Sequence, residues 1–110
     1  MAEIDKEAAE KLQELQILES TFQNLLMQKQ TFQLELNEIN TAIEEVDKSR
    51  GDIFKIIGQI MIKADKNITK KELEEKKKIL GLRTKTLEKQ ELSLRENVER
   101  LRGDIVEKIK

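Results

Sequence analysis

A single block of β-branched and aromatic residues, Ile53–Lys63, interrupts a chain of 110 residues that is otherwise charged and helical in its periodicity. Gly58 and Gln59 lie at its centre, and a type II′ turn needs glycine at the first of its two central positions. This turn predicts an antiparallel hairpin in which Ile57 faces Ile60. The other pairs in this register are Ile56 with Met61, Lys55 with Ile62, and Phe54 with Lys63.

The predicted hairpin is mostly apolar on both faces. A lone two-stranded hairpin is at best marginally stable in water, and its outer edges carry unpaired N–H and C=O groups. The rest of the sequence has no second block of this kind. We therefore expect other subunits to supply the missing strands. The alternative is a buried connector between helices that has no strand character.

Both arms beside this block carry a heptad pattern. In the first arm, apolar residues alternate at steps of three and four from Ala8 to Val46, which predicts a coiled-coil seam, the stripe along which two helices pack. Lys11 and Lys29 interrupt this seam. They either fix the register of the two helices, or their aliphatic stems lie along the seam while the ammonium groups reach water. The hairpin reverses the chain, so the two helices should pack antiparallel. The second arm has leucines seven residues apart: Leu73, Leu80, Leu87, Leu94 and Leu101.

Local signals predict where the helices begin and end. Gly51 follows a polar run and is placed to end the first helix. Thr69 and Glu72 have the spacing of a capping box at the start of the second, with Ile68 and Leu73 in the positions of a hydrophobic staple. We expect one domain over residues 1–110, mostly α, with a first helix over about 5–49, a hairpin over 52–64 and a second helix over 69–109.

The residue types exclude several classes of function. The sequence has no Cys and no His, so thiolate nucleophiles and imidazole bases are absent. Its many carboxylates recur at the spacing of exposed helix faces and alternate with Lys and Arg. No glycine-rich phosphate loop is present. We expect no enzymatic activity, no cofactor and no metal.

The sequence also bears on location. No stretch approaches the length of a membrane span. The first residues, Met1–Asp5, are acidic and lack the apolar run of a signal peptide. The absence of Cys fits an intracellular protein. We expect a cytoplasmic protein that has no membrane partner.

Charge is divided unequally along the chain. Residues 1–50 hold 5 Lys and Arg against 11 Asp and Glu, a net charge of −6, whereas residues 51–110 hold 16 against 11, a net charge of +5. These opposite charges favour the pairing of the two arms. A basic second arm leaves salt-dependent RNA binding as one alternative function. That arm has no aromatic residue on which a base could stack, so we expect no nucleic acid partner.

Both termini fall at the same end of the predicted helix pair, where apolar residues outnumber those that one seam can cover. The surplus predicts a partly exposed apolar tip. Fraying helix ends with scattered apolar side chains explain the same residues equally well. The residues are Ile4, Ala8, Ala9, Leu12, Leu101, Ile105, Val106 and Ile109.

Several local motifs accompany the heptads, and the hairpin with its central glycine, at its distance from both arms, is the more specific part. They are Gln28-Lys29-Gln30 and Leu36-Asn37-Glu38 in the first arm, Phe54-Lys55, Gly58 and Ile62-Lys63 in the hairpin, and Glu72–Lys76 and Leu82–Glu91 in the second arm. With these motifs the chain resembles the beta-type subunits of prefoldin, in an archaeal-like form, over nearly its whole length. Phe54 stands where that family most often has Tyr, which is a conservative difference.

This resemblance implies a hexamer of two alpha-type and four beta-type subunits whose hairpins combine into intersubunit β-barrels. Such a chaperone would hold non-native client proteins at its coiled-coil tips without ATP and pass them to a cytosolic group II chaperonin. Client contact would fall on the tip residues named above. Assembly would fall on Ile53, Phe54, Ile56, Ile57, Gly58, Ile60 and Ile62. Chaperonin docking would fall on Arg100, Arg102, Asp104, Glu107 and Lys108.

A structural coiled-coil scaffold or filament is the main alternative. Such a protein would transfer no clients, would have no alpha-type partner, and would associate through its own hairpins. A hairpin that is apolar on both faces suits a shared barrel better than a free-standing RNA-binding arm.

Overall fold

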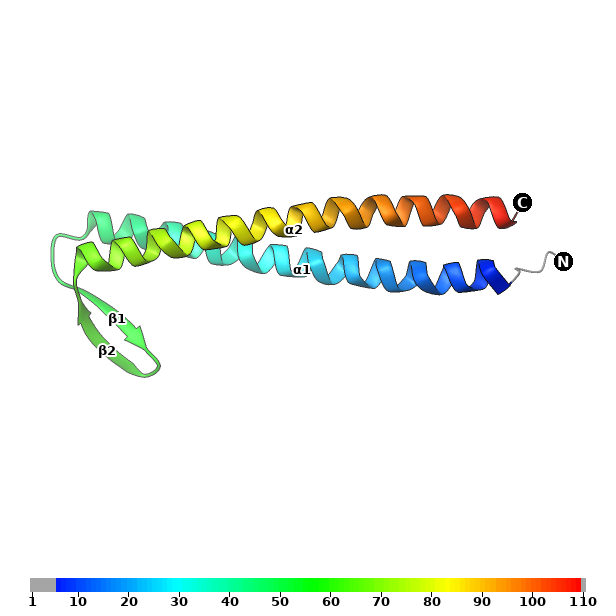
Figure 1. Ribbon diagram of the computed structural model, residues 1–110. Helices are drawn as coiled ribbons and strands as arrows, with labels where there is room; N and C mark the ends of the chain where they lie inside the picture. Colours follow the sequence, from blue (N-terminus) through cyan, green and yellow to red (C-terminus); the bar gives the residue numbers. More distant parts are fainter. Residues whose placement is uncertain (1–5, 110) are drawn as a thin grey trace. The chain divides into compact units, whose positions relative to one another are not determined.

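The computed structural model describes residues 6–109, except for the side chain of Ile109. Helix α1 (Lys6–Lys48) is followed by strands β1 (Ile53–Ile57) and β2 (Ile60–Ala64) and by helix α2 (Lys66–Ile109), as Figure 1 shows. The predicted mostly α fold with a single connecting hairpin is confirmed. The chain divides into two compact units. We call residues up to Gln30 with those from Lys85 onward the terminal unit, and Thr31–Thr84 the hairpin unit.

The hairpin has the predicted register. Ile57 lies opposite Ile60, and the pairing continues without a bulge to Ile53 and Ala64. Gly58 has a φ of +61°, whereas no other residue type within residues 6–109 has a positive φ. A positive φ at the first central position alone is the pattern of a type II′ turn. The alternative of a connector without strands is therefore wrong.

In the terminal unit, the first part of α1 and the last part of α2 lie side by side, drawn in blue and red in Figure 1. Its buried apolar side chains all follow steps of three and four along the two helices, so the seam is the core of this unit. They are Ala8, Leu25, Leu87, Val98, Leu101 and Ile105.

The two lysines that interrupt the seam both pair with the opposite helix. Lys11 Nζ lies 3.5 Å from an Asp104 carboxylate oxygen, and Lys29 Nζ lies 3.0 Å from Glu91 Oε2. The Glu91 side chain is only 14% exposed and also accepts a hydrogen bond from Arg95. A carboxylate that is largely removed from water is costly to leave without a partner, so these contacts favour one register of the two helices.

Helix α2 begins three residues earlier than predicted, so the capping box at Thr69 and Glu72, with its staple, is wrong. The N–H of Ile68 donates to Asp65 Oδ1 at 2.9 Å, and the N–H of Thr69 donates to the Asp65 carbonyl at 2.9 Å. Asp65 is therefore the N-cap. It directly follows the last residue of β2, and its negative charge is also favoured at a helix N-terminus.

The end of α1 also differs from the prediction, because Gly51 does not form a left-handed cap. Among residues 6–109, Gly58 is the only glycine with a positive φ. The helix ends at Lys48, and the Lys66 ammonium group donates to the carbonyls of Ser49 at 2.7 Å and Asp47 at 3.5 Å. A cation of α2 thus satisfies carbonyls at the C-terminus of α1, where positive charge is favoured.

Candidate assembly and binding surfaces

The hairpin exposes an apolar surface on both faces. Ile57 and Ile60, which face each other across the strands, are 61% and 63% exposed. Ile53 is half-buried near the hairpin's base. Met61 was missing from the predicted assembly set, although the strand alternation places it opposite Ile56. The large exposed side chains are Phe54, Ile56, Ile57, Ile60, Met61 and Ile62.

Ion pairs surround the base of the hairpin. Lys55 of β1 pairs with Glu72 of α2, and Lys63 of β2 lies 3.5 Å from an Asp52 carboxylate oxygen. Both pairs are partly exposed to water. Each pair therefore contributes little to the free energy of unfolding, as is usual for exposed ion pairs.

Lys70 in the first turns of α2 belongs to the same group of charges. Its ammonium group lies 2.8 Å from Asp47 Oδ1. The hydrogen bond and the charge of Asp47 raise the pKa of Lys70 above its ordinary value of 10.5. The lysine therefore remains charged beside the end of α1 at neutral pH.

The predicted apolar tip is only partly exposed. Ala8, Leu101 and Ile105 are buried in the seam of the terminal unit, and Leu12 is half-buried. Ala9 and Val106 are exposed. The predictions for Ile4 and for the side chain of Ile109 lie outside the described part of the chain.

The residues predicted to dock a chaperonin also have contacts within the terminal unit. Arg102 pairs with Glu19 at 2.6 Å, Asp104 with Lys11, and Lys108 with Glu7 at 2.5 Å. Arg100 donates to Asn97 on its own helix at 3.1 Å, and Glu107 is exposed. Three of these five residues thus connect α2 to α1.

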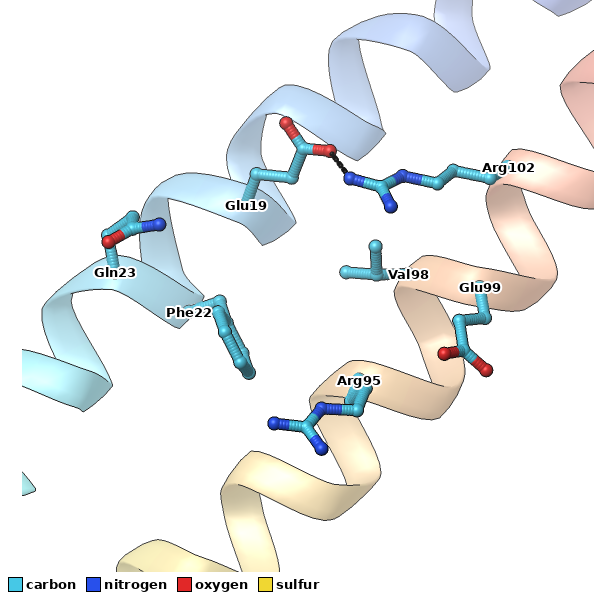
Figure 2. A pocket seen from close by; sticks show the side chains of 7 residues that line it. All are labelled: Glu19, Phe22, Gln23, Arg95, Val98, Glu99 and Arg102. Atoms are coloured by element: carbon cyan, nitrogen blue, oxygen red, sulfur yellow. Dashed lines mark hydrogen bonds and ion pairs between the residues drawn. The ribbon is translucent and has the colours of Figure 1, made fainter.

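Sequence reasoning missed a hollow of about 420 Å³ between the helices of the terminal unit. Figure 2 shows the Phe22 ring and Val98 facing this space, with the Glu19–Arg102 ion pair at one end. The Arg95 guanidinium carbon lies 5.7 Å from the centre of the Phe22 ring, a cation–π distance. The one available signal in the sequence was Phe22 itself, a large aromatic residue within the heptad pattern of the first arm.

Neither a metal site nor a membrane span is found in residues 6–109. No three His, Cys, Asp or Glu residues there are grouped so that they could hold a metal ion. Within the same range, neither helix has a stretch both long and apolar enough to cross a bilayer.

The family model for prefoldin subunits matches residues 9–110. This chain belongs to the prefoldin subunit family. A prefoldin subunit beta of Saccharolobus islandicus (strain L.S.2.15 / Lassen #1) is 39% identical over 110 residues, which cover 97% of this chain and 87% of the relative. A prefoldin subunit beta of Pyrobaculum islandicum is 36% identical over 107 residues, which cover 96% of this chain and 86% of the relative.

The crystal structure of the prefoldin beta subunit from Thermococcus strain KS-1 has the same fold. It matches with a TM-score of 0.90 at 29% sequence identity, covering 100% of this chain and 98% of that one. The resemblance to beta-type subunits is therefore confirmed. Prefoldin subunits are non-enzymatic chaperone components that assemble with one another, so family membership confirms that this chain is not an enzyme.

Proposed function

We propose that this chain is a beta-type subunit of a cytoplasmic hexamer with two alpha-type and four beta-type subunits. The hexamer holds non-native proteins without ATP and delivers them to a group II chaperonin. The hairpin gives the strongest support. Six large apolar side chains are exposed on a two-stranded sheet to which the described chain adds no third strand.

Assembly would complete this sheet. Strands from neighbouring subunits would pair with the N–H and C=O groups at the outer edges of β1 and β2, forming a barrel without open edges. Apolar surface removed from water in the barrel contributes about 25 cal/mol per Å² to association before the entropic costs are subtracted. The predicted assembly residues, with Met61 added, supply this surface.

Client binding is assigned to the end of the terminal unit that holds both termini. The exposed residues Ala9 and Val106, with the half-buried Leu12, support a small apolar contact surface. Ala8, Leu101 and Ile105 support it indirectly, because they hold the two helices together. Several weak tips on one hexamer bind a client by multivalency, so a client is released when a few weak contacts break.

Chaperonin docking is assigned to the charged residues of the same end. Arg100 and Glu107 are the better candidates, since neither is used in the ion pairs that connect α2 to α1 through Arg102, Asp104 and Lys108. Reversing the charges of Arg100 and Glu107 should therefore weaken client transfer while client holding remains.

The proposal is tested by mixing the chain with an alpha-type prefoldin subunit and measuring the native mass. We expect a complex of two alpha-type and four beta-type chains that suppresses the aggregation of a chemically denatured model protein. A filament or ring that ignores the alpha-type subunit would support the scaffold alternative instead.

Truncation then separates assembly from client holding. Removing residues 1–10 and 103–110 should leave the hexamer intact and abolish suppression of aggregation. Because the truncation also removes the buried Ile105, a variant with Ala9→Ser, Leu12→Ser and Val106→Ser serves as the matched test with the seam kept. Full suppression by both variants would overturn the assignment of clients to this end.

A further inference from the structure

The ion pair between Lys55 and Glu72 joins the hairpin to a helix within the hairpin unit. Lys55 lies in the middle of β1, and Glu72 lies near the beginning of α2. Each belongs to a motif that carries the resemblance to beta-type subunits, yet neither is apolar and neither is explained by burial in a barrel. Their side chains are 35% and 48% exposed.

The space beneath this pair is not filled by side chains. A hollow of about 350 Å³ lies between β1 and the start of α2, lined mainly by Ile56, Ile57, Thr69 and Leu73 as well as by the pair itself. Close packing normally fixes the angle between two elements, but here it is interrupted. The ion pair spans the gap, so it restrains the strand where packing does not.

We propose that Lys55 and Glu72 are positioning residues for assembly. Their ion pair holds the hairpin at one angle to α2, so that its apolar surface meets the strands of neighbouring subunits in a single orientation. The inference rests on the proposed function of the hairpin as the assembly surface. Holding a binding element in its bound orientation strengthens association, because less conformational freedom is lost on binding.

A positioning role predicts that loss of the ion pair weakens assembly without lowering the stability of the isolated chain. A partly exposed ion pair contributes little to the stability of the isolated chain, so its loss leaves thermal unfolding nearly unchanged. Lys55→Glu places two carboxylates beside each other and moves the hairpin away from its working angle. We expect the affinity for the alpha-type subunit to fall about fivefold, the upper end of what a surface ion pair contributes.

The test compares Lys55→Glu, Glu72→Lys and the double variant that exchanges the two charges. Affinity for an alpha-type subunit is measured by titration calorimetry, and thermal unfolding of the isolated chains by circular dichroism. Each single variant should bind about fivefold more weakly, and the double variant should recover to within about twofold. Lys63→Glu is the matched control, because Lys63 pairs with Asp52 at the base of the hairpin and not with α2.

Four results would overturn the inference. A double variant as weak as the single ones would mean that Lys55 touches the partner directly. Single variants that bind normally would show that the angle is fixed by something else. Unfolding temperatures that fall in step with affinity, or a Lys63→Glu variant that is equally weak, would indicate a general structural or charge effect. If the wild-type chain does not bind the alpha-type subunit, the proposed function itself is wrong. Binding by wild type therefore distinguishes a failure of the positioning role from a failure of the proposed function.

Discussion

The terminal unit and the hairpin unit use their apolar residues in opposite ways. In the terminal unit, six apolar side chains are buried along one seam between two helices of the same chain. In the hairpin unit, Leu80 alone among the described residues is buried to the same degree, whereas ten of the fourteen large apolar side chains that the structure exposes belong to this unit.

This difference indicates which unit is complete within one chain. A seam that buries its own heptad residues needs no partner to be stable. A two-stranded sheet with exposed apolar side chains on both faces lowers its free energy only when another surface covers them. The terminal unit is therefore complete within one chain, and the hairpin unit is expected to be completed by other subunits.

The largest expected effect comes from charging the hairpin. Replacing both Ile57 and Ile60 by Asp should weaken assembly with an alpha-type subunit at least about a hundredfold, because two carboxylates would be buried against apolar strands. Both isoleucines are exposed in the isolated chain, so its thermal unfolding should hardly change. Ile17→Asp, an equally exposed isoleucine of the terminal unit, is the control and should assemble normally. Normal assembly of the Ile57 and Ile60 variant would show that the exposed hairpin surface is not needed for assembly.

The second-largest effect is expected from shortening a buried side chain in the seam of the terminal unit. Leu101→Ala should lower the free energy of unfolding by about 2–4 kcal/mol, because it removes a buried side chain and leaves a cavity. Assembly at low temperature should remain, since the hairpin is unchanged. Urea unfolding measures the loss, and Leu92→Ala, at an exposed position of the same helix, should stay within about 0.5 kcal/mol of wild type. Equal losses in both variants would contradict a core confined to the seam.

A third pair of variants compares two glycines. Gly58→Val should destabilise the hairpin by about 1–2 kcal/mol and weaken assembly, because a β-branched residue strains a left-handed turn position. Gly81→Ala should instead raise the stability of α2 by about 1 kcal/mol, since an added Cβ there meets open space. Thermal unfolding and native mass measure the two effects. A stabilising Gly58→Val would show that the turn is not type II′.

The start of α2 gives a smaller effect. Asp65→Ala should cost about 1 kcal/mol, because it removes the side chain that caps the Ile68 N–H. Thr69→Val should cost nothing or stabilise, since Thr69 Oγ1 is buried and has no hydrogen-bond partner in the described structure. Urea unfolding of the two variants distinguishes the caps. A larger loss of stability in Thr69→Val than in Asp65→Ala would instead support a capping box at Thr69.

The smallest effect depends on pH. Asp47 raises the pKa of Lys70, so their pair adds stability that is fully present below pH 10.5 and is lost as pH rises through the higher folded pKa. The difference in urea midpoint between wild type and Lys70→Met should therefore be small at pH 8 and shrink further above pH 11. A difference that grows with pH would contradict this sign.

The sequence predicted the regular parts of the fold well, for a physical reason. Heptad spacing is repeated many times along both arms, so a single exception such as Lys29 does not disturb the prediction. The hairpin register followed from Gly58, because glycine alone readily adopts the left-handed conformation that the turn needs. The order of the elements, two long helices joined by one antiparallel hairpin, agreed with the prediction.

Single side-chain contacts were harder to predict. Asp65 rather than Thr69 caps α2, and Lys66 rather than Gly51 satisfies the end of α1. In each case the sequence offered two residues that could satisfy the end of a helix. Asp65 and Lys66 directly follow β2, so the position at which β2 ends decides which residues satisfy the helix ends. The hollow beside Phe22 was missed because heptad analysis assigns positions to a seam but does not measure how well they fill it.

The role of the hairpin is tested most directly by amide hydrogen exchange of the chain alone and after mixing with an alpha-type prefoldin subunit. We expect exchange to slow strongly across β1 and β2 on mixing, because the outer edges of the hairpin gain hydrogen-bond partners. Exchange in the described residues of the terminal unit should stay nearly unchanged. Slower exchange in the terminal unit with an unchanged hairpin would contradict the claim that the hairpin is the surface left for other subunits to complete.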